Sequence, residues 1–363
     1  MRKIVFIIPQ LSQPRCIKRV NAFYDAGFEV EVFGFDKGLY SKNISSYSCK
    51  THRIPEKGKT TKIQSLLQNV RLIQEVKKDL KKNDLLYIFG IELASFYRLL
   101  CGRNAYVYEQ ADLNYTKLNN KFLVSLFRCI DKYLIFKSYK TVLTSQGFVD
   151  YLYRDKHAPS NIVLLQNRLN KKLEHISVRE HTFNPNAIRF AFIGAIRYTR
   201  TILAFARVVA EKFPNHEFHF YGEGLFSNQA KELCERYPKN LYYHGSFSNP
   251  DDLPMIYSNV DVNVVCNDTA SMNVRIAEPN KLYESCFFRV PLVVSKSTFL
   301  EKRVLNMGVG YSIDSTNESE IISFIKSINQ ESLEKSLEAM RQIPHEQLFD
   351  NTMELIQSIG KAE

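Results

Sequence analysis

The sequence contains no tryptophan and no Cys-x-x-Cys pair, although other aromatic residues are plentiful. Its seven cysteines are scattered and odd in number, so we expect reduced, mostly buried thiols rather than disulfides or a structural zinc site. The eight histidines show neither metal-binding spacing nor a catalytic triad. With 20 tyrosines and 25 phenylalanines, the 363 residues suffice for two domains with large cores.

Long apolar runs are also missing. The most apolar stretch, residues 85–101, is interrupted by Glu92 and Arg98 and falls short of the ~20 apolar residues that span a membrane. Residues 1–9 have too short an apolar run for a signal peptide and no small-residue cleavage site follows, so they predict a buried strand. No internal repeat or low-complexity segment is present. We therefore expect a cytoplasmic protein.

Charge is divided unequally between the two halves. Residues 1–170 hold 28 Lys and Arg against 14 Asp and Glu, a balance of +14, whereas residues 171–363 hold 21 against 24, a balance of −3. Such asymmetry suggests an anionic partner of the first half. No DNA- or RNA-binding motif accompanies it, so nucleic acid is not the expected partner.

A basic amphipathic helix is expected over residues 117–140, where Phe and Leu alternate with Lys and Arg. This composition suits an anionic membrane surface, which would place the protein at the inner face of the cytoplasmic membrane. The alternative is that the apolar side packs on a sheet while the lysines are solvated. For a similar basic helix over residues 62–82 we expect packing on the sheet.

Strand and helix signals alternate along both halves, which predicts an α/β protein with parallel, doubly wound sheets. In the first half we expect strands at 4–8, 29–35, 85–89, 105–108, 141–144 and 162–165, and helices at 17–26, 62–82 and 122–139. In the second half we expect strands at 190–193, 216–221, 260–265 and 292–295, and helices at 203–213, 229–237, 281–287 and 346–359. The polar segment 170–187 is the expected linker between two Rossmann-like domains, at 1–170 and 187–345, and residues 346–363 form a C-terminal helix.

The segment PNKLYE, residues 279–284, precedes the apolar strand of RVPLVVS, residues 289–295. We expect a helix with Pro279 in its first turn, whose free N–H groups at Asn280 and Lys281 suit a phosphate. Lys281 adds a full positive charge, and Glu284 lies one turn later, where a carboxylate accepts hydrogen bonds from ribose hydroxyls. Together they predict a nucleotide site; an ordinary amphipathic helix is the alternative.

This segment resembles the donor-site helix of GT-B glycosyltransferases, specifically the retaining family 4. Three further segments resemble that family in the same order: FIGAIRY at 192–198, YGEG at 221–224 and IYSNVDV at 256–262. The resemblance covers the whole chain and is more specific in the second half. It implies the GT-B fold, with two Rossmann-like domains facing each other across a cleft and a C-terminal helix that crosses back onto the first. The first domain would bind the acceptor and the second the nucleotide sugar.

The resemblance also implies an activity: metal-independent transfer of a sugar, with retention, from a nucleotide-diphosphate sugar to a glycan or lipid-linked acceptor in polysaccharide or glycoconjugate synthesis. It requires no cofactor and no metal, because basic side chains neutralise the diphosphate. The catalytic residues it implies are Arg197 and Lys281. The donor-binding residues it implies are Arg200, Gly222, Gly224, Asn273, Asn280, Leu282 and Glu284. The acceptor-side residues it implies are Arg15, Arg19, Gln110 and Asp112.

Two departures from the family pattern affect the details. The spacing of Arg197 and Arg200 after Gly194 leaves open which arginine contacts phosphate. Ile276 stands where many relatives have a first glutamate, and the nearest acid, Glu278, comes two residues later, so the donor sugar is undefined. Other interpretations are a different GT-B enzyme, such as a nucleotide-sugar 2-epimerase, and a non-catalytic module that binds sugar or nucleic acid.

Overall fold

The structure is a computed structural model that describes residues 3–36, 46–55, 61–154, 156–178, 180 and 182–360. The chain divides into two compact units, one formed by residues up to Asn167 together with those from Asn351, the other by Arg168–Asp350. The expected linker at 170–187 belongs to the second unit, because Leu173 and Phe183 are buried in that unit's core. The linker assignment was therefore wrong.

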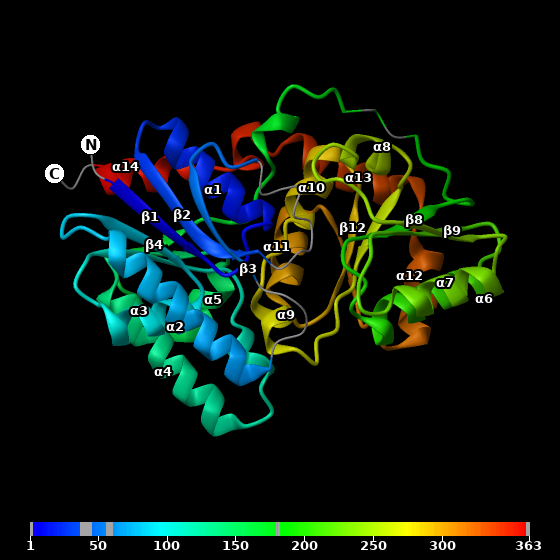
Figure 1. The fold of residues 1–363 in the computed structure, drawn as a ribbon. Coiled ribbons are helices and arrows are strands. Elements are labelled where there is room, and N and C mark those ends of the chain that lie inside the picture. Colours follow the sequence, from blue (N-terminus) through cyan, green and yellow to red (C-terminus); the bar gives the residue numbers. More distant parts are fainter. Residues whose placement is uncertain are drawn as a thin grey trace. The chain divides into compact units, whose positions relative to one another are not determined.

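The first unit is built on a parallel sheet of seven strands in the order β3-β2-β1-β4-β5-β6-β7 (Figure 1). Its strands are β1 (Lys3–Ile8), β2 (Glu29–Asp36), β3 (Lys50–Pro55), β4 (Leu85–Phe89), β5 (Tyr106–Gln110), β6 (Lys140–Leu143) and β7 (Ile162–Leu164). Its helices are α1 (Pro14–Asp25), α2 (Lys62–Asp79), α3 (Ile91–Leu100), α4 (Lys121–Lys137), α5 (Gln146–Tyr153) and α14 (Thr352–Gly360). The central strands are apolar on both sides, as a sheet covered on both faces requires.

Helix ends in the first unit follow local rules. Pro14 occupies the first turn of α1, where its missing N–H costs nothing, and Gly27 follows the helix with a φ of +88°. Thr61 and Gln64 form a reciprocal capping box at the start of α2. Asn120 caps α4 by accepting from the N–H groups of the next turn.

The C-terminal segment returns to the first unit. Residues 346–359 were predicted as one helix, but a short 3-10 turn, His345–Gln347, is followed by an irregular stretch before α14 begins at Thr352. Leu355, Ile356 and Ile359 of α14 are buried in the core that includes β1 and α1. The apolar side of α14 therefore completes the core of the first unit.

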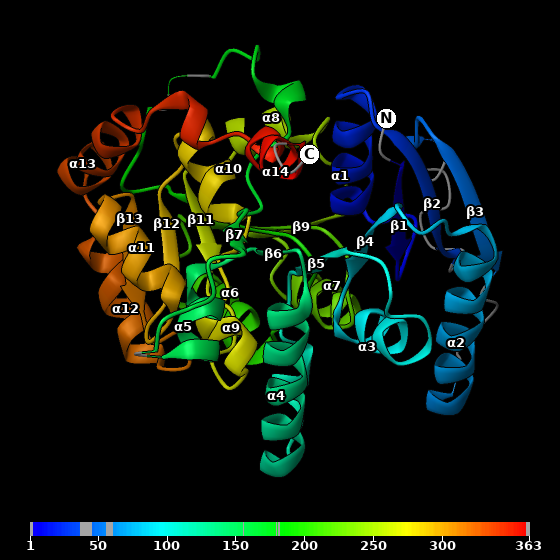
Figure 2. The ribbon, with the colours of Figure 1, turned by 90° about the vertical axis from the view of Figure 1, so that its left-hand side faces the viewer.

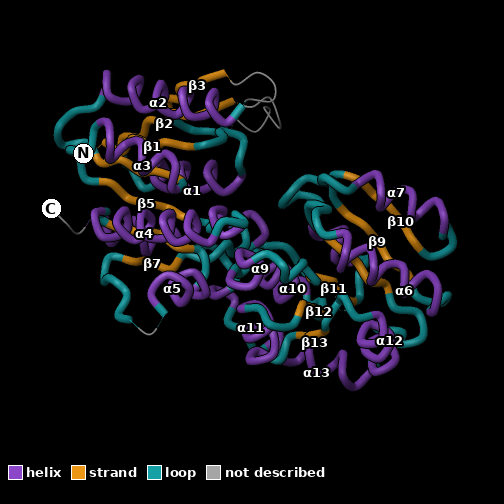
Figure 3. The backbone as a smooth tube through the Cα atoms, turned by 90° about the horizontal axis from the view of Figure 1, so that it is seen from below, coloured by secondary structure: helices purple, strands orange, loops and turns teal. Residues whose placement is uncertain are grey.

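The second unit has a parallel sheet of six strands in the order β10-β9-β8-β11-β12-β13, with helices on both sides (Figure 3). Its strands are β8 (Arg189–Ile193), β9 (Glu217–Tyr221), β10 (Leu241–Gly245), β11 (Val262–Val265), β12 (Leu292–Ser295) and β13 (Gly310–Ile313). Its helices are α6 (Ala204–Lys212), α7 (Ser227–Arg236), α8 (Leu253–Ser258), α9 (Met272–Ile276), α10 (Lys281–Phe288), α11 (Phe299–Met307), α12 (Glu318–Ser327) and α13 (Gln330–Arg341). The strand order reverses between β8 and β11, so ligands are expected at the carboxyl ends of these strands.

Helices α2, α3 and α4 lie side by side on the first unit (Figure 2) and expose large apolar side chains. The exposed apolar residues are Ile63, Leu66 and Leu67 of α2, Leu99 and Leu100 of α3, and Phe122, Leu123, Leu126 and Phe136 of α4. The expected packing of the apolar face of helix 62–82 is therefore confirmed only in part: Leu72, Ile73 and Val76 are buried, whereas the first turns of the helix expose their apolar side chains. None of the helices that the structure describes is both long and apolar enough to cross a bilayer.

Candidate functional site

Two glycine-containing loops meet at the carboxyl ends of β8 and β9. A β-carbon on Gly222 would lie 2.0 Å from the carbonyl oxygen of Gly194, and one on Gly224 would lie 2.5 Å from that of Ile196. Gly222 also has a φ of +126°. Both positions therefore require glycine for the close approach of the loops, and ligand contact by Gly222 and Gly224 stays a prediction.

The amino end of α10 lies against this pair of loops. The helix begins at Lys281 with Asn280 as its N-cap, so Pro279 precedes the helix rather than occupying its first turn. The side chain of Lys281 is largely buried and passes beside Gly194, with its ammonium 5.8 Å from the centre of the Phe247 ring. A cation and a helix amino end thus sit together at the edge where the sheet order reverses.

Glu284 is the hub of the site. It is 2% exposed, and its two carboxylate oxygens accept from four side chains. Oε2 accepts from the Lys281 ammonium at 2.6 Å and from the Tyr257 hydroxyl at 3.0 Å, while Oε1 accepts from the amides of Asn280 at 2.6 Å and Asn249 at 3.4 Å. A ribose would reach Glu284 only by displacing some of these donors.

Sequence reasoning found Glu284, Asn280 and Lys281 but missed the residues that position them. Tyr257 is fully buried and donates to Glu284, and the buried amide of Asn263 donates to Tyr257 and Ser285. The only signal was that Tyr257 falls in the family-like segment 256–262.

Arg197 lies in the loop after β8, and Arg200 lies in the π-helical turn that follows, Thr199–Leu203, which leads into α6. The Nε atom of Arg200 lies 4.0 Å from Asp268 Oδ2, and its side chain is 67% exposed. Arg197 forms no ion pair with any residue that the structure describes. Neither side chain is fixed, so their contact with a phosphate stays a prediction.

Three other residues near α10 differ from expectation. Leu282 is fully buried in the apolar core, so its side chain has no access to a donor, and donor binding by its backbone stays a prediction. Asn273 is also buried, on α9, a short helix that is not among those expected from the sequence. Glu278 accepts from the Tyr283 hydroxyl and lies 3.3 Å from Arg303; burial raises its pKa although both neighbours oppose this. Glu278 is thus a core group.

In the first unit, two of the four acceptor-side residues are buried. Arg19 is 1% exposed; its Nε lies 3.1 Å from Glu109 Oε2, and it also donates to Thr352. An acceptor-facing role for Arg19 was therefore wrong, because the guanidinium belongs to a buried ion pair. Gln110, at the end of β5, is likewise buried. Arg15 is partly exposed, 3.4 Å from Glu109, and Asp112 is exposed.

A cavity of about 580 Å³ lies over one face of β8, β9 and β10. His219 is hydrogen-bonded to His244 and Glu217, both at 3.0 Å, and the His244 ring stacks on Tyr221. Burial lowers the pKa values of His219 and His244. Within the described part of the chain, no group of three or more His, Cys, Asp or Glu residues is arranged to hold a metal ion.

No protein-family model and no curated protein matches the chain. Solved structures match along nearly its whole length. A sucrose-phosphate synthase from Thermosynechococcus elongatus is 13% identical, with 99% of each chain covered and a TM-score of 0.74. Anabaena HepE in complex with UDP and glucose is 14% identical, with 99% of each chain covered and a TM-score of 0.71. The lipopolysaccharide outer core galactosyltransferase WaaB is 14% identical over 99% of this chain and 100% of its own, with a TM-score of 0.62. This chain has the GT-B fold, as the sequence predicted.

Proposed function

We propose that this protein transfers a sugar from a nucleotide-diphosphate sugar to a glycan or lipid-linked saccharide acceptor. The supporting observation is the packing of Lys281 and the α10 amino end against the Gly194 loop, at the carboxyl edge where the sheet order reverses. The structures of HepE with UDP and with UDP-glucose, which share this fold, support a uridine nucleotide as the first candidate.

Lys281 and Glu284 have linked roles in this proposal. As the glycosidic bond breaks, negative charge grows on the diphosphate, and prepositioned cations stabilise it. Lys281 is positioned for this by its hydrogen bond to Glu284. When a nucleotide binds, Lys281 turns towards the phosphates, and the freed oxygen of Glu284 accepts from ribose. Arg197 and Arg200 add charge from the adjacent loop.

Titration calorimetry with UDP and GDP tests the site. Lys281→Met should weaken nucleotide binding about 10-fold to 100-fold. This loss corresponds to the free energy of one charged hydrogen bond. Glu284→Gln should also weaken it, because an amide accepts ribose hydroxyl bonds less well than a carboxylate. Lys239→Met, which removes an exposed lysine elsewhere in the second unit, is the matched control. Unchanged affinity in well-folded Lys281→Met protein would refute the site.

The chemistry is proposed to retain the anomeric configuration and to need no metal ion. The family-like segments support retention, and the cations Arg197, Arg200 and Lys281 support metal independence. NMR of the newly formed anomeric centre checks the first, since an inverted product contradicts it. Transfer in excess EDTA checks the second: we expect turnover to survive, and complete loss with rescue by manganese would contradict it.

An anionic membrane surface is the proposed partner of the first unit, on the cytoplasmic face. The exposed apolar residues of α2, α3 and α4 lie among exposed lysines, and α4 carries Lys121 and Lys137. Each basic residue near such a surface contributes about 1 kcal/mol, screened by salt. Arg128 donates to the Leu152 carbonyl and Lys132 lies over the Tyr153 ring, so these two are engaged with the protein.

Sedimentation with anionic vesicles at low salt measures this binding. Variants that reverse the charge of exposed lysines are the best test of it. The Lys117→Glu, Lys121→Glu, Lys137→Glu triple variant should release the protein from vesicles. The matched control reverses the same charge on the second unit, at Lys239, Lys326 and Lys335, which are also exposed. If both variants bind as the wild type does, α4 is not a membrane contact.

A further inference from the structure

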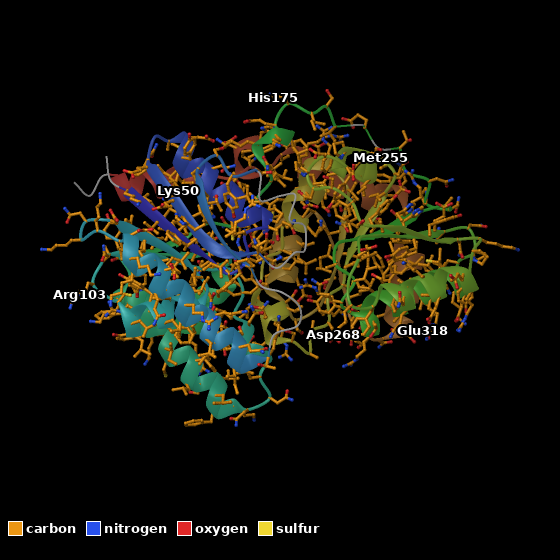
Figure 4. The ribbon with its side chains drawn as sticks, in the orientation of Figure 1. Lys50, Arg103, His175, Met255, Asp268 and Glu318 are labelled. Carbon is orange, nitrogen blue, oxygen red and sulfur yellow. The ribbon has the colours of Figure 1, made fainter. Side chains whose placement is uncertain are left out.

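A polar pocket of about 420 Å³ lies at the carboxyl ends of β11, β12 and β13. It is separate from Lys281 but shares with it the loop that follows β8. Asp268, on its wall, is labelled in Figure 4. Charged and hydroxyl side chains also line the wall, among them Arg200, Thr201, Arg275, Lys296, Asp314 and Glu320.

Charged groups on the β13 side of the pocket are already bonded to neighbouring residues. The Lys296 ammonium lies 2.7 Å from Glu320 Oε2. The Asp314 carboxylate accepts from the N–H and the hydroxyl of Thr316. These groups therefore hold the wall together: the charges of Lys296 and Glu320 cancel, and Asp314 leaves one negative charge on this side.

The wall formed by Arg200 and Arg275 is different, because these two guanidinium groups keep N–H donors that no described residue accepts from. Arg275 donates from Nε to the Thr269 carbonyl at 2.6 Å, and its terminal nitrogens bond to no residue that the structure describes. Arg200 Nε is 4.0 Å from Asp268 Oδ2, which is too long for a hydrogen bond. Two cations thus face one carboxylate.

Thr201 provides an independent observation. Thr201 lies in the wall of this polar pocket and is 1% exposed. Its hydroxyl has no hydrogen-bond partner among the described residues. A buried hydroxyl left without a partner costs about 1–3 kcal/mol, so proteins rarely leave one in a wall without use. A bound ligand that accepts from this hydroxyl removes the cost.

We propose that this pocket binds an oxyanion carried by a sugar, held by Arg200, Arg275 and Thr201. Forked guanidinium donors match the two oxygens of a carboxylate or phosphate, and the surrounding hydroxyls of Ser295, Ser315 and Thr316 suit sugar hydroxyls. The oxyanion is either the carboxylate of a uronic acid on the nucleotide sugar or the phosphate of a separate sugar phosphate. The inference rests on the proposed function, because both ligands belong to the sugar-transfer reaction.

Calorimetry with five probes separates these sources: UDP, UDP-glucose, UDP-glucuronate, glucose 6-phosphate and inorganic phosphate. A uronate donor predicts that UDP-glucuronate binds at least about 10-fold more tightly than UDP-glucose. A separate sugar phosphate predicts that glucose 6-phosphate binds in the presence of saturating UDP, and more tightly than inorganic phosphate. Equal binding of the two phosphates and of the two UDP-sugars would overturn the proposal.

Variants of the lining residues test whether the preference for the oxyanion probe arises in this pocket. Arg275→Gln should abolish the preference that the wild type shows, whereas Arg207→Gln, which removes an exposed arginine on α6, should keep it. Thr201→Val should weaken the oxyanion ligand about fivefold yet raise the unliganded unfolding temperature, because it removes an unpartnered buried hydroxyl. A preference that persists in Arg275→Gln would refute the assignment.

The two proposals can fail separately. If neither UDP nor GDP binds, the proposed function fails. If UDP binds through Lys281 but neither oxyanion probe is preferred, only the inference about this pocket fails.

Discussion

The Arg19 guanidinium lies 3.1 Å from the Glu109 carboxylate, and both side chains are at most 1% exposed. The pair joins α1 to β5 across 90 residues of sequence, and the Tyr87 hydroxyl also donates to Glu109. A buried charge whose partner is removed is strongly destabilising, so this pair gives a sharp test of the first unit.

Arg19→Met should lower the free energy of unfolding by up to about 3–5 kcal/mol, because Glu109 loses its buried partner and keeps only the partly exposed Arg15 as a cationic neighbour. Urea denaturation followed by far-UV circular dichroism measures the change. Arg15→Met, at a partly exposed position 3.4 Å from the same carboxylate, should cost far less. The double variant Arg19→Met, Glu109→Gln should recover part of the loss; no recovery would mean that the charge is not the cause.

Gly222→Ala should destabilise the second unit by at least about 2–3 kcal/mol, because its β-carbon would lie 2.0 Å from a carbonyl oxygen at a positive φ. Gly245→Ala is the matched control: its φ is also positive, but the nearest atom would be 3.8 Å away, so only about 1–2 kcal/mol of backbone strain is expected. Thermal unfolding compares them. Similar losses would show that the contact between the loops is not tight.

Asp131 should make the first unit less stable as the pH rises. The residue is fully buried on α4 and accepts from the hydroxyls of Tyr108 and Tyr115; burial raises its pKa from 3.8 to about 6 although these bonds oppose the shift. Its contribution is complete below pH ~4 and is lost as the pH rises through ~6. Relative to Asp131→Asn, wild type should lose roughly 2–3 kcal/mol between pH 4 and 7. A constant difference between the two proteins over this range would rule out the shift.

The histidines of the second unit should have the opposite effect. Burial lowers the pKa values of His216, His219 and His244 from 6.5, so neutral histidine is favoured in the folded state. Their contribution is complete above pH ~6.5 and is lost as the pH falls through the lower folded values. The free energy of unfolding should therefore fall less steeply at acid pH in His219→Gln than in the wild type. His157→Gln, which replaces an exposed histidine of the first unit, is the control and should leave this dependence unchanged.

Most central strands and long helices could be predicted from the sequence, because short continuous apolar runs such as 4–8 and 292–295 indicate buried strands and helical spacing marks the long helices. The edge strand β3, with the sequence KTHRIP, was missed because its polar residues resemble a loop. Short helices such as α9 were missed because five residues carry too little periodicity.

The residues of the candidate site also fall into those that the sequence could predict and those that it could not. Lys281, Asn280 and Glu284 are close in sequence and could be found from one turn of helix. The partners of Glu284 could not, because Asn249 and Tyr257 reach it from 35 and 27 residues away. The burial of Arg19 was equally hidden: its position on a basic, amphipathic helix is compatible with solvent until Glu109 is placed beside it.

The return of α14 to the first unit affects the order in which the protein can fold during synthesis. Leu355, Ile356 and Ile359 fill the core beside β1, and Thr352 accepts from the buried Arg19. A ribosome makes these residues after the whole of the second unit. The first unit to emerge is therefore the last to be completed, and until then its apolar core stays open on one side, available to a chaperone or to another chain.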